Sequence, residues 1–162
     1  MLCVLLLIFS RIGDGVLAAS GLAFSALTTQ LFKHIINAPR PVTWFAANMP
    51  DVQLPLVDGV QMNYWFSFPS GHTTSFFALF FALSIIAGNY LAEKRLVSAA
   101  TQVLFFLLAA LGGYSRIYLS QHFALDVFAG TLVGILITLL CYAILHRYEG
   151  QKWYNYRVLA KK

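Results

Sequence analysis

Long runs of apolar residues dominate the chain, and polar residues gather in the segments between these runs. Four runs are each long enough to cross the roughly 30 Å of hydrocarbon in a bilayer as a helix, and they cover residues 16–36, 71–88, 96–117 and 122–145. A further apolar run, residues 1–10, is too short to span a membrane. The pattern predicts an all-α polytopic transmembrane helix bundle with about four full spans and a short N-terminal apolar segment.

The short N-terminal run does not have the form of a secretory signal peptide. Its neighbouring positive charge, Arg11, follows the apolar residues instead of preceding them, and no small-residue cleavage site stands out. We interpret the run as the end of a helix whose start is missing, or as a short re-entrant piece.

The longest segment between spans, residues 37–69, is expected to be a loop. It contains all five prolines of the chain. Part of it, loop 42–66, is rich in side chains that favour the membrane interface, and these are Trp44, Phe45, Met49, Tyr64, Trp65 and Phe66. We expect this loop to lie on the lipid headgroups, either as a lid or guide for lipid tails or as a plain interfacial anchor.

The composition agrees with a membrane protein. Hydrophobic residues make up 59% of the 162 residues and charged residues only 10%, whereas a soluble domain has about 25% charged residues. We expect one integral-membrane domain over residues 1–162, with a core at about 16–146 and a basic cytoplasmic tail at 147–162. The two cysteines, Cys3 and Cys141, lie in apolar runs, and no Cys/His pair has zinc spacing. The sequence therefore predicts neither a metal site nor a cofactor.

The distribution of lysine and arginine predicts the orientation in the membrane. One side of the predicted bundle carries Arg11, Lys94, Arg95, Arg147, Lys152, Arg157, Lys161 and Lys162. The other side carries only Lys33, Arg40 and Arg116. Positive loops face the cytoplasm, so the first side is expected to be cytoplasmic. The basic tail suits anionic headgroups better than nucleic acid, so we expect the bilayer as a partner and no nucleic acid.

The three cations on the outer side belong to three polar clusters, and the first cluster contains Lys33 and Arg40. Arg40 lies between Pro39 and Pro41, which restrict its backbone. The planar guanidinium of arginine matches phosphate oxygens in a bidentate way, and lysine adds a point charge. Snorkelling to the interface is the alternative interpretation of Lys33.

The second cluster, Pro69-Ser70-Gly71-His72, opens the second span. Ser70 is placed as the N-cap of that helix, and the first N–H groups of the helix can bind an anion. His72 lies beside them and can pass a proton to a leaving group. A capped helix start with an interfacial histidine is the alternative.

The third cluster places Arg116, His122 and Asp126 where a span ends and the next begins. Ionisable groups near membrane helices are costly and are candidates for function. With a spacing of four residues, His122 and Asp126 are expected to share a helix face, where the carboxylate would fix the imidazole tautomer. A structural polar pair is the alternative. All three clusters map to one membrane face, which predicts a single phosphate site with a nucleophile and an acid.

These residues resemble the motifs of the type 2 phosphatidic acid phosphatase superfamily, which also includes the vanadium haloperoxidases. The motifs appear in order as Lys33…Arg40-Pro41, Pro69-Ser70-Gly71-His72 and Ser115-Arg116…His122…Asp126, and all eleven fixed positions match. The resemblance covers about residues 16–146.

The resemblance implies a metal-independent phosphohydrolase with a phosphohistidine intermediate. It makes His122 the nucleophile, Asp126 its orienting carboxylate, and His72 the group that protonates the leaving oxygen and then activates water. It assigns the phosphate oxygens to Lys33, Arg40, Ser70, the Gly71 N–H and Arg116. The substrates it implies are lipid phosphates or pyrophosphates, such as phosphatidic acid, phosphatidylglycerol phosphate, a polyprenyl pyrophosphate or a lipid A phosphate.

The resemblance also leaves alternatives open. Membrane members of the family typically have six spans, and this chain shows four plus a short segment. A truncated or naturally short chain, with a second copy or a partner subunit over an exposed face, fits this difference. We expect a bacterial inner membrane with the site facing the periplasm. The competing functions are a non-enzymatic lipid-binding or transport protein that retains the phosphate site, and a vanadate-dependent haloperoxidase.

Overall fold

The computed structural model describes residues 10–158, and in this range the chain forms helices and no β-strand. The helices are α2 (Ile12–Ile36), α3 (Pro41–Asn48), α4 (Gly71–Tyr90), α5 (Arg95–Tyr118), α6 (Ala124–His146) and α7 (Lys152–Asn155). Helices α2, α4, α5 and α6 are long and apolar enough to cross a membrane. The predicted all-α bundle with four spans is therefore confirmed. The N-terminal apolar run lies almost wholly outside the described residues.

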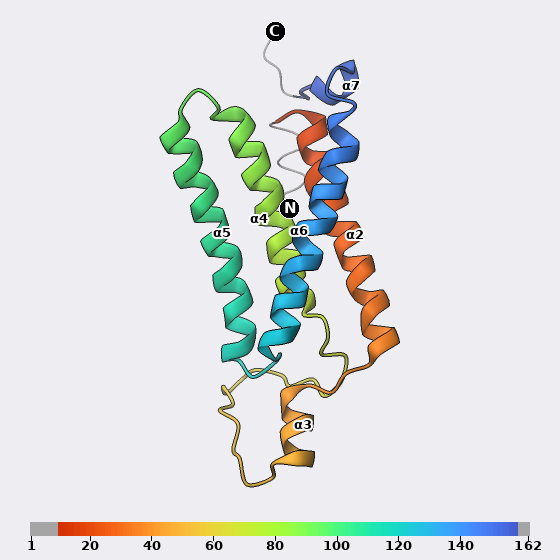
Figure 1. The fold of residues 1–162 in the computed structure, drawn as a ribbon, viewed down its shortest axis with the longest axis vertical. Helices are drawn as coiled ribbons and strands as arrows, with labels where there is room; N and C mark the ends of the chain where they lie inside the picture. Colours follow the sequence, from red (N-terminus) through yellow and green to blue (C-terminus); the bar gives the residue numbers. More distant parts are fainter. Residues whose placement is uncertain (1–9, 159–162) are drawn as a thin grey trace.

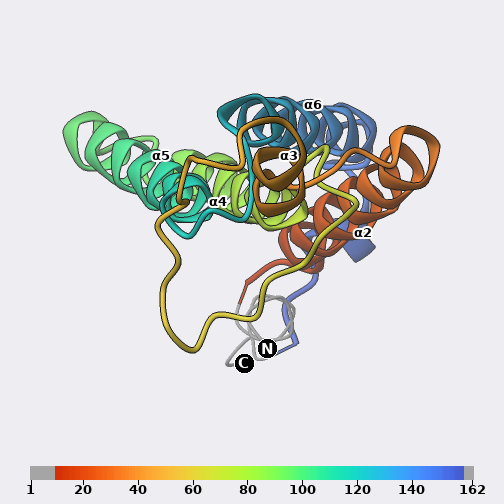
Figure 2. The same ribbon diagram turned by 90° about the horizontal axis from the view of Figure 1, so that it is seen from below.

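Helix α4 lies at the centre of the bundle. It packs against α2, α5 and α6, whereas α5 has its main contacts with α4 alone. Figures 1 and 2 show the long helices side by side, with α3 and its loop at one end and α7 and the α4–α5 connection at the other. The C-terminal ends of α2 and α5 and the N-terminal ends of α4 and α6 meet at the end of the bundle that carries α3. We call this end of the bundle the site end.

Two glycines allow α6 to lie close against α4. A Cβ atom on Gly130 would stand 2.6 Å from the carbonyl oxygen of Ser70, and one on Gly134 would stand 2.6 Å from that of Thr74. Small residues at such contacts let membrane helices approach closely. The close packing brings the starts of the two helices together, where the Ser70 N–H donates to the carbonyl oxygen of Asp126 over 3.0 Å.

The opposite end of the bundle is closed by the chain that follows α6. Tyr154 of α7 is buried and packs on Gly13 of α2. Beside it, Asp14 pairs with Arg11 at 3.1 Å and accepts a hydrogen bond from the Tyr90 hydroxyl at 2.9 Å. These contacts join three segments of the chain far from the site end.

Most helix boundaries lie within two residues of the predicted ones, and three differences matter for the fold and the site. The first span begins at Ile12, four residues earlier than predicted, and α3 occupies part of the predicted loop. Helix α3 forms because Arg40 is its N-cap and Pro41 its first residue, where a missing N–H and a fixed φ cost nothing. The fourth span begins at Ala124, so His122 lies just before the helix and not in it.

The glycine contact predicts a matched pair of stability effects. Replacing Gly134 with alanine places a methyl group against the backbone of α4 and should destabilise the bundle by about 1–3 kcal/mol through overpacking. Gly150→Ala is the control, because a Cβ there meets nothing within 4 Å. Thermal unfolding in detergent checks this, and equal melting temperatures for the two variants would show that α4 and α6 are not in close contact.

Candidate functional site

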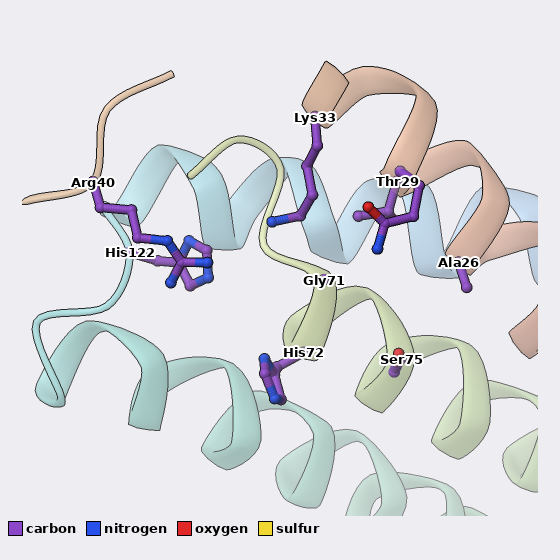
Figure 3. A pocket seen from close by; sticks show the side chains of 9 residues that line it. Ala26, Thr29, Lys33, Arg40, Gly71, His72, Ser75 and His122 are labelled. Atoms are coloured by element: carbon purple, nitrogen blue, oxygen red, sulfur yellow. The ribbon is translucent and has the colours of Figure 1, made fainter. Parts of the chain in front are cut away.

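A pocket of about 280 Å³ opens at the site end between α2 and α4. It is lined by Ala26, Thr29, Gln30, Lys33, Arg40, Gly71, His72, Ser75 and His122. Figure 3 shows the side chain of Lys33 directed toward Arg40 and His122, with His72 on the first turn of α4. Five of the eight predicted site residues thus line one pocket, although they come from distant parts of the chain. The other three, Ser70, Arg116 and Asp126, are not among the residues that line it.

A carboxylate stands directly behind the His122 imidazole. The Nδ1 atom of His122 is 3.5 Å from Oδ2 of Asp126, and both side chains are buried. The Ser67 hydroxyl donates to the same Oδ2 atom at 2.5 Å and lies 3.4 Å from His122 Nδ1. Because Nδ1 faces the carboxylate, the other ring nitrogen, Nε2, is available to the pocket. An imidazole held in this way is suited to act as a nucleophile.

A turn, and not a helix face, brings His122 and Asp126 together. The N–H groups of Gln121 and His122 both donate to the carbonyl oxygen of Arg116, at 3.1 and 3.2 Å, which ends α5 in a tight turn. Asp126 then reaches back and accepts the N–H of Phe123 at 2.9 Å. The predicted contact is therefore present, but the predicted reason, a shared helix face, is wrong. Burial lowers the pKa of His122, and the hydrogen bond that its imidazole donates to Asp126 opposes this shift.

Arg40 is a buried cation held by neutral acceptors. It is 9% exposed. Its Nε donates to the carbonyl oxygen of Trp65 at 3.0 Å, and its Nη1 donates to the side-chain oxygen of Gln121 at 2.9 Å. Its backbone N–H donates to the carbonyl oxygen of Tyr64 at 2.9 Å. These hydrogen bonds hold the guanidinium, in addition to the restriction that Pro39 and Pro41 place on the backbone.

The other two cations also lack an acidic partner. Lys33, in the last turn of α2, donates to the carbonyl oxygen of Phe66 at 2.5 Å. Within residues 10–158, no carboxylate lies within 4.0 Å of the charged nitrogens of Lys33, Arg40 or Arg116. The Nε atom of Arg116 is buried and has no hydrogen-bond partner in the same range. The positive charges of these three side chains all interact electrostatically with His72. The site therefore has a strong excess of positive charge.

The start of α4 leaves backbone donors uncapped. Ser70 is the N-cap residue, as predicted, but its side chain makes no capping hydrogen bond. Its hydroxyl instead accepts one from Thr73 Oγ1 at 2.9 Å. The first N–H groups of a helix have no partners inside the helix, so those that follow Ser70 remain available to an anion beside Gly71. His72 is exposed and lies next to them.

Two buried polar residues of the site were missed by the sequence analysis. Ser67 is fully buried and supports Asp126, and Gln121 is 1% exposed and supports Arg40. Each lies within three residues of a motif histidine or proline, and this proximity was the only signal. Among the residues that the structure describes, no group of three or more His, Cys, Asp or Glu side chains is arranged to hold a metal ion.

Comparison with known protein families shows to which family the chain belongs. The model of the PAP2 superfamily matches residues 14–149. The chain is a member of the PAP2 superfamily. This confirms the resemblance that the three motifs indicate.

Individual PAP2 proteins are also similar to this chain. A probable lipid phosphate phosphatase 4 from Arabidopsis thaliana is 32% identical, over 77% of this chain and 46% of its own length. A lipid A 4′-phosphatase from Porphyromonas gingivalis is 27% identical, over 86% of this chain and 53% of its own length. The chain thus spans about half the length of these curated relatives.

A solved structure supports the fold at the level of coordinates. The crystal structure of Aquifex aeolicus LpxE superposes with a TM-score of 0.66 at 32% identity. The match covers 88% of this chain and 74% of LpxE. The overall arrangement of the helices is therefore one that a solved relative shares.

The contact with Asp126 predicts the direction of a titration shift. Asp126→Asn removes the negative charge that favours the imidazolium, so the pKa of His122 should fall further below its usual value of about 6.5. NMR titration of histidine-labelled protein in lipid nanodiscs measures this. Glu149→Gln is the control, since its carboxylate lies 3.0 Å from His146 at the other end of the bundle. A pKa of His122 that rises or stays constant in Asp126→Asn would contradict the contact.

Proposed function

We propose that this chain is a metal-independent phosphatase of lipid phosphates or pyrophosphates, which acts as a single membrane domain through a phosphohistidine on His122. One observation carries the proposal. A histidine with a carboxylate behind it opens into the same pocket as two cations that have no acidic partner, Lys33 and Arg40. A nucleophile and an anion-binding surface are thus joined in one place.

The electrostatics of the pocket favour a phosphate as the ligand. Burying a charge without a counter-ion is costly, and Arg40 is buried with only neutral acceptors around it. A phosphate dianion would supply the missing negative charge to Arg40, Lys33 and Arg116 together. The uncapped start of α4 adds backbone N–H donors. Phosphoryl transfer is catalysed mainly by such positioning and charge stabilisation.

The arrangement supports a reaction in two steps. In the first step, the lone pair of His122 Nε2 attacks phosphorus, the bond from phosphorus to the leaving oxygen breaks, and protonated His72 gives its proton to that oxygen. In the second step, neutral His72 takes a proton from water, the resulting hydroxide attacks phosphorus, and the phosphorus–nitrogen bond returns its electrons to His122. Asp126 stabilises the charge on the imidazole without being consumed.

The position of the pocket supports a lipid as the substrate. The pocket lies where α2 ends and α4 begins, and its lining continues along α2 from Lys33 through Thr29 to Ala26. A lipid phosphate bound near Lys33 would therefore have its phosphate group at headgroup depth and its apolar part beside the helices. The names of both curated relatives, a lipid phosphate phosphatase and a lipid A 4′-phosphatase, support the same class.

The distribution of charge supports a site that faces away from the cytoplasm. Arg11, Lys94 and Arg147 lie next to helix ends opposite the site end, where they agree with the positive-inside rule. In a bacterial inner membrane this orientation places the pocket on the periplasmic face. Labelling of single cysteines from outside intact cells measures the orientation directly.

Phosphate release tests the proposed activity. Purified protein should release phosphate from at least one member of a panel of lipid phosphates and pyrophosphates, and EDTA should not reduce the rate. His122→Ala should lower the rate on the order of 10³-fold or more, as loss of a nucleophile does. His146→Ala is the control, because this exposed histidine lies at the other end of the bundle. Full activity in His122→Ala would disprove the assignment, and no release from any lipid would favour a non-enzymatic role.

A further inference from the structure

We propose that Gln121 is a positioning residue for Arg40, and that it ties the phosphate-binding guanidinium to the outer loop between α3 and α4. The motifs of the family leave this position unassigned in the present chain. The inference rests on the proposed function, because it takes Arg40 to be a phosphate-binding group. It adds a residue through which the loop can influence that group.

The amide of Gln121 holds Arg40 from one side. Its oxygen Oε1 accepts a hydrogen bond from Arg40 Nη1 at 2.9 Å, and its backbone oxygen accepts a second from the same nitrogen at 3.3 Å. Gln121 is 1% exposed, so both bonds are shielded from water. Hydrogen bonds to a charged group contribute more than those between neutral groups. The guanidinium therefore has a defined direction before any phosphate arrives.

The other end of the same amide holds the loop. Its nitrogen Nε2 donates to the carbonyl oxygen of Gln61 at 3.2 Å and lies 3.1 Å from the sulfur of Met62. Arginine offers only donors and a carbonyl offers only an acceptor, so the group between them must provide an acceptor and a donor. A side-chain amide does so, whereas a carboxylate or an apolar side chain of similar length does not.

The hydrogen bonds that the Arg40 side chain makes to the protein leave one of its nitrogens, Nη2, for the ligand. Nε is used by Trp65 and Nη1 by Gln121. Within the described part of the chain, Nη2 makes no hydrogen bond, while Arg40 lines the pocket. Fixing Nε and Nη1 on protein acceptors thus directs Nη2 toward the phosphate. Without Gln121 the guanidinium would lose this constraint, and phosphate binding would weaken more than the chemical step.

The experiment compares two substitutions of similar size, Gln121→Met and Gln121→Glu. We expect Gln121→Met to raise both KM and the inhibition constant of inorganic phosphate about tenfold, and to change kcat by less than about threefold. Gln121→Glu should impair phosphate binding more than Gln121→Met, since its negative charge faces the same guanidinium. A merely structural role predicts the opposite order, because glutamate is closer in shape to glutamine. That opposite order would overturn the proposal.

A double-mutant cycle identifies the group through which Gln121 acts. In an Arg40→Lys background, Gln121→Met should change the inhibition constant of phosphate by less than about twofold, because residues that act through one contact are not additive. Multiplicative effects would overturn the proposal. Ser120→Ala is the control: it removes a different hydrogen bond to the loop, to the Pro55 carbonyl at 2.8 Å, and should leave the inhibition constant unchanged.

Binding of inorganic phosphate can be measured by the shift in melting temperature that it causes. This measurement repeats the comparison of the Gln121 variants without turnover. If the wild-type protein releases no phosphate from lipids but binds inorganic phosphate, the proposed activity fails while the ranking of the Gln121 variants still decides this inference. If the wild-type protein does not bind inorganic phosphate, both fail.

Discussion

The carboxylate of Asp126 is the interaction on which the site depends. One of its oxygens receives the Ser67 hydroxyl and the Phe123 N–H and lies against His122. The backbone carbonyl of the same residue receives the N–H of Ser70 at the start of α4. One residue thus fixes the start of α6, the start of α4, the segment before α4 and the imidazole. The close packing of α4 and α6 at Gly130 makes this convergence possible.

The site gathers positive charges in one place, which is electrostatically costly when no anion is bound. Three cations and two histidines gather around one pocket, and Asp126 is engaged by His122 and Ser67. Neutral carbonyl and amide oxygens hold Lys33 and Arg40 in place without cancelling their charge. Such acceptors fix direction while preserving the attraction for an anion, which acidic partners would remove. The positive charge that makes the site costly without a ligand is what the proposed phosphate would neutralise.

Much of this could be predicted from the sequence, because membrane helices and motif spacing are strong local signals. Four spans followed from apolar runs, and the single pocket followed from placing Lys33, His72 and His122 at helix ends on one membrane face. Helix α3 was missed because loop composition around Pro41 hides a two-turn helix. The turn before α6 was missed because hydrophobicity continues through Phe123 and does not mark the N-cap.

Ser67 and Gln121 show a different limit of sequence reasoning. Their importance comes from partners 59 and 81 residues away in the chain, Asp126 and Arg40. Neither residue type is costly enough at the membrane surface to attract attention, unlike a buried histidine or aspartate. Only the folded arrangement shows that each completes a hydrogen-bond network around a residue that the motifs contain.

The central claim is that His122 forms a covalent bond to phosphorus during turnover. The most direct measurement is a rapid acid or base quench of a single turnover with a radiolabelled lipid phosphate, followed by peptide mapping. The account predicts protein-bound label that is stable in base, labile in acid, located on His122 and absent from His122→Ala. Release of labelled phosphate in the first turnover without any label on His122 would contradict it.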